Sequence, residues 1–179
     1  MKQITVFIIT VLLLGCISNE KNEDSKIKDQ ALIETMLSER FMRFQKSSNP
    51  IEQAKYYVEN ITDDAIWMPQ NGKRLQGKVE VKEWAKWFFS NYQLIAEDDK
   101  LIVDNILISK NLAVRRFISG GYYIIKASGD TIPFDQKYED VFLKENGEWK
   151  IASHTWSSNN MKQSVWNPEC QPFSNQNLE

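Results

Sequence analysis

The chain has 179 residues, of which 42% are hydrophobic and 26% charged, and its formal net charge is −2. This size and composition suit one globular domain with a sizeable core. The slightly negative charge excludes the basic surface of a nucleic-acid-binding protein, so no nucleic-acid partner is expected. Two cysteines and one histidine are too few for a cysteine-based metal site, and neither a metal nor a cofactor is expected.

Residues 1–15 have the pattern of a secretory signal peptide. Lys2 supplies a positive charge, and residues 4–14 are apolar apart from two threonines. A bilayer span needs about 20 apolar residues, so this stretch is too short to cross a membrane. It ends in the letters LLGC at residues 13–16, which resemble the lipobox of bacterial lipoproteins. The resemblance implies that residues 1–15 are removed and that Cys16 is lipidated. The protein would then be membrane-anchored in the bacterial cell envelope, in the periplasm or at the surface.

Residues 16–28 are rich in charged and polar side chains. Such a composition predicts a flexible tether between the lipidated Cys16 and a folded domain. If Cys16 carries lipid, Cys170 has no partner, so an intramolecular disulfide is not expected. The folded domain is predicted at residues 29–158, followed by a C-terminal tail at residues 159–179.

Three helices are predicted in the first half of the domain, where apolar side chains recur every three or four residues. These helices are expected at residues 29–45, 50–60 and 78–92. Asn49 suits the N-cap of the second helix, and Pro50 suits its first position. Two short strands are expected before the third helix, at residues 65–69 and 73–75.

From residue 94 onward the sequence predicts an antiparallel sheet. Strands are expected at residues 101–109, 112–126, 132–144 and 149–158. Gly120 and Gly121, inside the second of these strands, predict a bulge or a sharp bend. Helices followed by a sheet indicate an α+β fold, with the helices packed on one face of the sheet.

Asn146 and Gly147 predict a two-residue hairpin turn, which sets the pairing of the last two strands. The pairs that follow are Phe142 with Ile151, Asp140 with Ser153, Tyr138 with Thr155, and Glu139 with His154. The face that carries Phe142 is the more apolar, so we assign it to the concave, helix-covered side of the sheet. Asp140 then points inward and His154 outward, and a one-residue bulge would reverse the direction of His154.

Three features together resemble the nuclear transport factor 2-like superfamily, and within it the SnoaL-like, polyketide cyclase-related group. They are the order of helices and then sheet, the stretch ITDDAIWMPQNGKRLQGKVEVKEW and the stretch YEDVFLKENGEWKIASHTWSSN. The elements that recur in this group are here Asp64 with Ala65, Gly77, and the run GEWKI at residues 147–151. The resemblance covers residues 29–158.

The resemblance implies a cone in which about three N-terminal helices pack on a strongly curved antiparallel β-sheet around a deep pocket. Dimers through the outer sheet face are common in the superfamily, so a homodimer is an expectation. The same cone hosts isomerases, dehydratases, hydrolases, cyclases and proteins that only bind or assemble. The fold therefore does not decide the activity, which has to be argued from the site.

Asp140 and His154 are the candidate catalytic residues. A carboxylate in an apolar pocket can shuttle a proton, and cyclases and isomerases of this fold use an aspartate or a histidine in that way. The alternative role for Asp140 is a structural ion pair with Arg115 or Arg116 on the neighbouring strand. For His154 the two interpretations are a catalytic base oriented by Glu139 and a half-exposed residue on the outer face.

Four further residues are predicted to line a ligand pocket, although core packing is the alternative for the aromatic ones. They are Trp67, Trp84, Arg115 and Tyr138. The principal functional expectation is a lipoprotein that binds a small hydrophobic or amphipathic molecule without turnover. The alternatives are an acid–base enzyme of isomerase, dehydratase or hydrolase type, and an interaction module that dimerises through its sheet.

Overall fold

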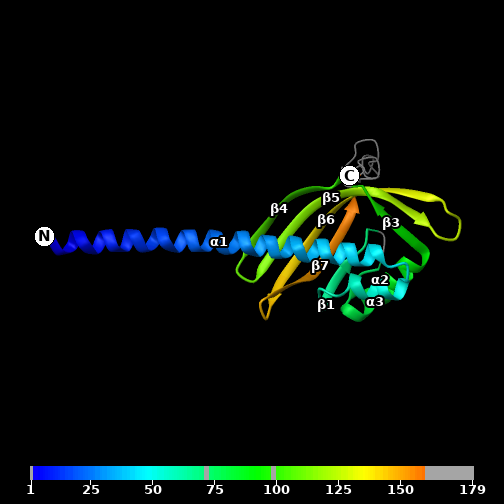
Figure 1. The fold of residues 1–179 in the computed structure, drawn as a ribbon, viewed down its shortest axis with the longest axis horizontal. Helices are drawn as coiled ribbons and strands as arrows, with labels where there is room; N and C mark the ends of the chain where they lie inside the picture. Colours follow the sequence, from blue (N-terminus) through cyan, green and yellow to red (C-terminus); the bar gives the residue numbers. More distant parts are fainter. Residues whose placement is uncertain (1, 71–72, 98–99, 160–179) are drawn as a thin grey trace, which may run out of the picture.

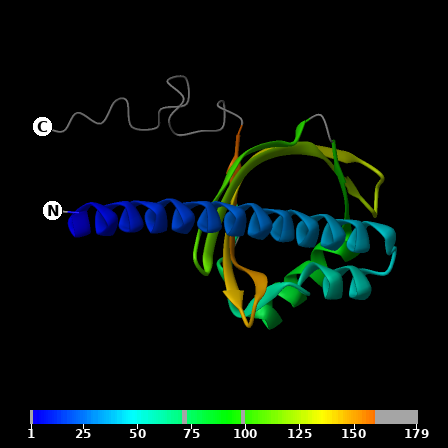
Figure 2. The ribbon, with the colours of Figure 1, turned by 60° about the vertical axis from the view of Figure 1, so that its left-hand side comes forward.

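The fold combines three helices with one curved sheet. The structure is a computed structural model that describes residues 2–70, 73–97 and 100–159, with side chains from Glu23 onward except that of Asp104. Its elements are α1 (Lys2–Lys46), α2 (Pro50–Tyr57), β1 (Ile61–Met68), β2 (Leu75–Gln76), α3 (Lys78–Asn91), β3 (Tyr92–Ala96), β4 (Ile102–Ser109), β5 (Leu112–Ile125), β6 (Thr131–Glu145) and β7 (Glu148–Ser158). The sheet arches over α1, and α2 and α3 lie against the open side of the arch (Figures 1 and 2). The predicted α+β cone is confirmed.

Helix α1 begins far earlier than the sequence led us to expect. Residues 16–28, predicted as a flexible tether, are part of one helix that runs from Lys2 to Lys46. No glycine or proline occurs between residues 17 and 46, and glutamate and lysine, both good helix formers, are frequent there. Pairs at helical spacing add support, such as Lys26 with Glu23 at 2.9 Å.

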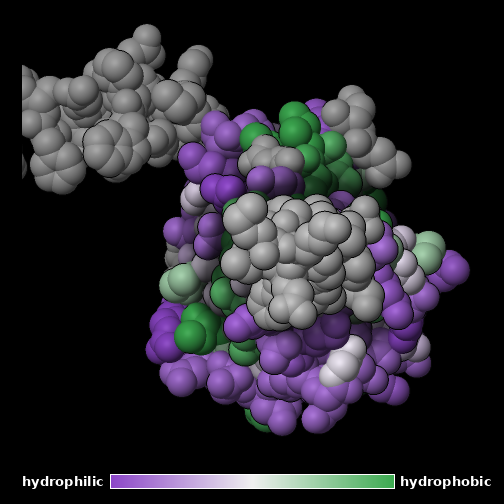
Figure 3. Space-filling view, turned by 90° about the vertical axis from the view of Figure 1, so that its left-hand side faces the viewer, coloured by the Kyte–Doolittle hydropathy of each residue, from purple (hydrophilic) through white to green (hydrophobic). Residues whose placement is uncertain are grey.

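The described part of the chain holds no helix that is both long and apolar enough to cross a membrane. Figure 3 views the domain along α1, from the end toward which its N-terminal part projects. The surface visible in this view is mostly hydrophilic, and hydrophobic residues appear at its upper edge and in smaller areas at its left side.

The sheet has the strand order β2-β1-β7-β6-β5-β3, and β4 also pairs with β5. Strand β5 is long enough to pair with β4 along its first half and with β3 along its second half. The pairing of β1 with β7 is parallel, whereas the other pairs are antiparallel. The sheet is therefore mixed rather than antiparallel throughout, because β1 runs in the same direction as its neighbour β7.

The two glycines of β5 allow a close approach of neighbouring chain segments and do not form a bulge in the pairing with β6. The β5–β6 pairing runs without interruption from Leu112 to Ile124, so the bulge predicted at Gly120 and Gly121 is absent there. Gly121 has φ +151°, and a Cβ atom on it would lie 2.1 Å from the carbonyl oxygen of Ile95 on β3. A side chain at this position would push β3 away from the sheet.

The core lies between the helices and the concave face of the sheet. The largest fully buried side chains include Trp67, Phe142, Ile33, Ile61 and Ile151. A second buried cluster joins the three helices and consists of Phe44, Ala54, Ala85 and Phe89. The predicted N-cap is confirmed, because the Asn49 side chain accepts a hydrogen bond from the Ile51 N–H at 2.9 Å.

Asp29 fastens α1 to the hairpin between β6 and β7. Its buried carboxylate oxygen Oδ1 accepts hydrogen bonds from Lys144 Nζ at 2.6 Å and from Trp149 Nε1 at 3.2 Å. The contact joins residues more than 110 positions apart in sequence. It fixes α1 on the sheet at the point where the helix enters the domain.

Candidate functional site

A one-residue bulge in β7 decides which side chains face the interior. The turn at Asn146 and Gly147 sets the predicted register as far as the pair of Phe142 with Ile151. Beyond it the register shifts by one, because Ala152 on β7 has no counterpart on β6. The pairs observed are Val141 with Ser153, Asp140 with His154, Glu139 with Thr155, and Tyr138 with Trp156.

His154 therefore points inward, and our assignment of it to the outer face opposite Glu139 was wrong. A strict alternation would have turned Trp156 toward solvent together with His154. With the bulge, Trp156 stays on the concave side, 5.9 Å from Trp84 of α3 between ring centroids. Packing of this large ring accounts for the shift. Asp140, predicted inward, is on the concave side with only 2% of its surface exposed.

Asp140 and His154 form a close polar pair across β6 and β7. The distance from His154 Nδ1 to Asp140 Oδ1 is 2.5 Å. A carboxylate accepts hydrogen bonds, so Nδ1 carries the proton in this contact and Nε2 of the neutral ring is left as the acceptor. The Asp140 side chain is 3% exposed and the His154 side chain 15% exposed. The imidazole can thus meet a ligand while its orienting carboxylate stays covered.

Arg115 of β5 approaches the other oxygen of Asp140. Its Nη1 atom lies 3.7 Å from Asp140 Oδ2, an ion-pair distance longer than a direct hydrogen bond. The guanidinium lies over the ring of Phe117, with Cζ 4.2 Å from the ring centroid. Burial lowers the pKa of Arg115 below its usual value, and the charge of Asp140 opposes this effect. The predicted ion pair between Asp140 and Arg115 is present, whereas Arg116 faces the other side of the sheet.

Aromatic rings surround His154 on three sides. The centroid distances from its ring are 5.3 Å to Trp67, 5.6 Å to Tyr138 and 5.0 Å to Trp156. Tyr138 stacks on Phe117 at 4.6 Å, and its hydroxyl donates to Gln136 Oε1 at 2.6 Å. Burial raises the pKa of Tyr138, so its hydroxyl stays protonated as a hydrogen-bond donor.

Tyr57, at the end of α2, is a polar group of this region that sequence reasoning missed. Its hydroxyl accepts a hydrogen bond from Trp67 Nε1 at 3.0 Å, and burial raises its pKa. Arg40 of α1 holds the residue in place, because its Nε donates to the Tyr57 carbonyl at 2.8 Å and its Cζ lies 4.5 Å from the ring centroid. Tyr57 follows the buried Ala54 by three residues, and residues at this spacing lie on the same face of a helix. This spacing is the sequence feature that could have indicated an inward-facing Tyr57 ring.

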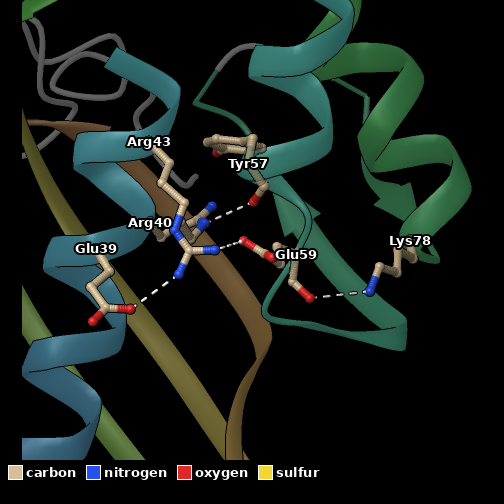
Figure 4. A network of polar contacts seen from close by, with 6 residues as sticks. All are labelled: Glu39, Arg40, Arg43, Tyr57, Glu59 and Lys78. Atoms are coloured by element: carbon tan, nitrogen blue, oxygen red, sulfur yellow. Dashed lines mark hydrogen bonds and ion pairs between the residues drawn. The ribbon is translucent and has the colours of Figure 1, made fainter. Parts of the chain in front are cut away.

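Figure 4 shows how α1 is joined to the segment that carries Tyr57. Arg43 donates to Glu59 at 2.6 Å and to Glu39 at 3.0 Å. Lys78 of α3 reaches the Glu59 carbonyl at 3.3 Å. These contacts set the position of α2 over the concave face, and with it the position of the Tyr57 hydroxyl.

Five of the predicted site residues come together, and the sixth lies one ring further away. Asp140, His154, Arg115, Tyr138 and Trp67 form a contiguous group, and Trp84 reaches it through Trp156. Trp67 is fully buried, so it supports His154 from behind rather than lining an open surface. Cys170 and the tail from residue 160 lie outside the described residues. Within the part of the chain that is described, no third carboxylate, thiol or imidazole joins Asp140 and His154 to hold a metal ion.

One hollow lies along strands β1, β5, β6 and β7 of the sheet. Its volume is about 510 Å³, and residues of both faces line it. Phe117, Tyr138 and Trp156 belong to the aromatic group near His154, whereas the other lining residues face outward: Met68, Arg116, Ile118, Lys137, Glu139, Thr155 and Ser157. A second hollow of about 310 Å³ lies between α1 and the β6–β7 hairpin. Neither is lined by Asp140 or His154, but the first hollow is lined by Tyr138 and Trp156, the ring neighbours of His154.

Comparison with known proteins identifies the fold. No protein-family model and no curated protein matches the sequence. A ketosteroid isomerase-like protein from Erwinia carotovora atroseptica SCRI1043 is similar, with a TM-score of 0.62 and 20% identity over 73% of this chain and 95% of that chain. A proposed scytalone dehydratase from Novosphingobium aromaticivorans gives a TM-score of 0.61 and 12% identity over 76% and 88% of the two chains. A conserved protein from Planctomyces limnophilus gives 0.58 and 16% identity over 72% and 94%.

At these identities the likeness establishes the architecture and leaves the activity open. The chain has the nuclear transport factor 2-like α+β fold, as its resemblance to the SnoaL-like group predicted.

Proposed function

We propose that the concave face binds a small molecule and that His154 moves a proton on it, in an acid–base reaction of isomerase or dehydratase type. The observation that carries this proposal is the 2.5 Å contact between His154 Nδ1 and Asp140 Oδ1. It leaves Nε2 unprotonated in the neutral ring, which is the state of a general base. An inward set of base, orienting carboxylate and cation favours catalysis over binding alone.

The chemistry follows from the three groups in turn. Nε2 of His154 removes a proton from the carbon next to a carbonyl group, and the electrons of that C–H bond form the C=C bond of an enolate. The imidazolium that forms is stabilised by Asp140. It then returns the proton to another atom of the substrate, as in an isomerisation, or to a departing hydroxyl group, as in a dehydration. Two of the similar structures carry names of these two reaction types.

The surroundings favour a substrate with an apolar or aromatic body. The rings of Tyr138 and Trp156 lie beside His154 and are only partly buried. Partly exposed rings next to one polar group are typical of sites that bind small organic molecules. The same surface also suits a protein that binds such a molecule without turnover, which is the second candidate function.

Deuterium exchange separates these two functions. The mature protein is incubated in D₂O with a panel of small aromatic ketones, and loss of the α-proton is followed by proton NMR. We expect one or more members to exchange faster than in buffer. A panel that binds, as seen by ligand line broadening, yet exchanges at the buffer rate would assign the site to binding alone.

We further propose that the protein is a lipoprotein of the bacterial cell envelope. The basis is the apolar stretch that ends in Gly15 and Cys16. In cells fed an alkyne fatty acid, the wild-type protein should be labelled and should sediment with membranes, whereas Cys16→Ser should lose the label. Cys170→Ser is the matched control and should keep it. Equal labelling of wild type and Cys16→Ser would contradict the anchor.

The outer face of the sheet is proposed to pair with a second copy of the chain. Leu112 and Leu143 lie opposite each other on β5 and β6 with 44% and 36% of their surfaces exposed, and Leu107 is 54% exposed. The domain without its anchor should therefore sediment as a dimer at micromolar concentration, and Leu143→Asp should shift it to a monomer. Val79→Asp, at an exposed position of α3, should leave the dimer intact. A monomeric wild type would exclude this pairing.

A further inference from the structure

Arg115 is held in a fixed position but keeps hydrogen-bond donors unused. A guanidinium has five N–H donors. In the described ranges, its one charged partner within 4 Å is Asp140, at 3.7 Å, and no acceptor lies within hydrogen-bond distance. Its side chain is 14% exposed, and none of its nitrogens is both fully buried and unpaired. These donors are therefore free to bind acceptors that a ligand supplies.

The direction of the guanidinium is set by stacking. Arg115 lies on Phe117, Phe117 stacks on Tyr138, and Tyr138 stacks on His154. The guanidinium and the imidazole therefore lie at the two ends of one series of stacked rings, and both lie within 4.0 Å of the same carboxylate. A ligand that engages Arg115 with one end places its other atoms beside His154.

The charged groups of the site do not fully compensate one another, so the site can accept an anion. Asp140 is shared between His154 and Arg115 and satisfies the guanidinium only at long range. Glu34 of α1 also acts on Arg115 electrostatically, but it is exposed and already accepts a hydrogen bond from Gln30 at 2.9 Å. When His154 takes up a proton, Asp140 has two cations beside it. A carboxylate on the ligand would restore the balance.

Building on the function proposed above, we propose that Arg115 binds a carboxylate of the ligand, so that the substrate is a small carboxylic acid with an apolar or aromatic body. Planar, two-pronged recognition of a carboxylate is what a guanidinium provides and a lysine does not. The carboxylate at Arg115 orients the molecule, and a C–H bond further along it meets Nε2 of His154.

The test compares two probes of equal size. Phenylacetate carries the carboxylate, and phenylacetamide replaces it with a neutral amide. Binding to the mature protein is followed at pH 7 by tryptophan fluorescence, because Trp156 and Trp67 lie next to His154. We expect phenylacetate to bind at least about tenfold more tightly than the amide, since hydrogen bonds to charged groups are the stronger ones.

Variants assign this preference to one residue. Arg115→Gln should reduce the preference to about one, whereas Arg116→Gln, which removes the same charge from an exposed position on the same strand, should leave it unchanged. Asp140→Asn should tighten binding of phenylacetate alone, because it removes the competing carboxylate. If Arg115→Gln does not fold, Asp140→Asn still tests the carboxylate site. Tighter binding of phenylacetate alone supports the site, and unchanged binding of phenylacetate contradicts it.

Three results would overturn the carboxylate site: equal affinity of wild type for both probes, an equal loss in the Arg115 and Arg116 variants, or no detectable binding of phenylacetate. His154→Gln keeps failure of this proposal distinct from failure of the proposed reaction. It should retain the preference for the carboxylate even though proton transfer is lost.

Discussion

Replacing His154 with glutamine is expected to lower the rate of α-proton exchange by about 10²–10⁴-fold, the usual contribution of a general base. Glutamine keeps a hydrogen bond to Asp140 but has no nitrogen that can take up a proton at neutral pH. The measurement is deuterium incorporation by proton NMR with the best substrate of the ketone panel. Ser153→Ala changes the neighbouring residue on the outer face and should leave the rate unchanged. A full rate in the glutamine variant would remove His154 from the mechanism.

The sole histidine of the chain also makes its protonation directly observable. In ¹⁵N NMR spectra of the neutral form, Nδ1 should carry the proton in the wild type. Asp140→Asn should abolish this preference and slow exchange, because an amide does not orient and stabilise the imidazolium as a carboxylate does. It should also lower the free energy of unfolding by about 1–3 kcal/mol, since it leaves the partly buried Arg115 without its anion. These two results together would assign to Asp140 both roles that the sequence left open, the catalytic one and the structural ion pair.

Trp149→Ala is expected to lower the free energy of unfolding by about 3–5 kcal/mol, as truncation of a large core aromatic does. Trp149 is 4% exposed and packs in the main core with Ile151 and Phe142. The variant also removes the indole N–H that donates to Asp29 at 3.2 Å. Asp29 keeps Lys144 as a partner, so most of the loss comes from packing rather than from an unpaired carboxylate.

Urea unfolding followed by far-UV circular dichroism measures this loss. Trp87→Ala is the matched control, because Trp87 is 55% exposed on α3 and its truncation should cost less than about 1 kcal/mol. A similar cost in both variants would mean that the core does not depend on the hairpin between β6 and β7. A loss below about 1 kcal/mol for Trp149→Ala would place its ring outside the core.

Most elements of the fold were predictable because their signals are local. The helices α2 and α3 and the long strands β4 to β7 begin and end within a few residues of their predicted positions, except that α2 stops at Tyr57. Asn49 and the turn at Asn146 and Gly147 act through their own backbone neighbours, so one sequence suffices to find them. The parallel pairing of β1 with β7 has no such signal, because it depends on how the whole chain closes.

The site shows the same limit in a single residue. The turn fixed the register up to Ile151, and Ala152 then enters the strand as an unpaired residue. The small side chain of Ala152 does not reveal the bulge in the sequence, because the bulge depends on how Trp156 packs against Trp84 in the folded protein. The direction of Asp140 was predicted correctly because the bulge lies on β7 and leaves the alternation along β6 unchanged. The direction of His154 was predicted wrongly because His154 follows the bulge on β7. Tyr57 and Arg40 join the region through helix packing, which spacing along one helix only hints at.

With Cys16 lipidated as proposed, the continuity of α1 would determine how the domain stands at a membrane. A helix rises 1.5 Å per residue, so the 13 steps from Cys16 to Asp29 span about 20 Å along its axis. A lipidated Cys16 would then hold the domain on a stiff spacer, with the Asp29 contact to Lys144 and Trp149 as its fixed base. Each residue added to that spacer would turn the lipid by about 100° around the axis. The number of residues between Cys16 and the domain would thus set both the distance of the site from the bilayer and the direction in which the site faces.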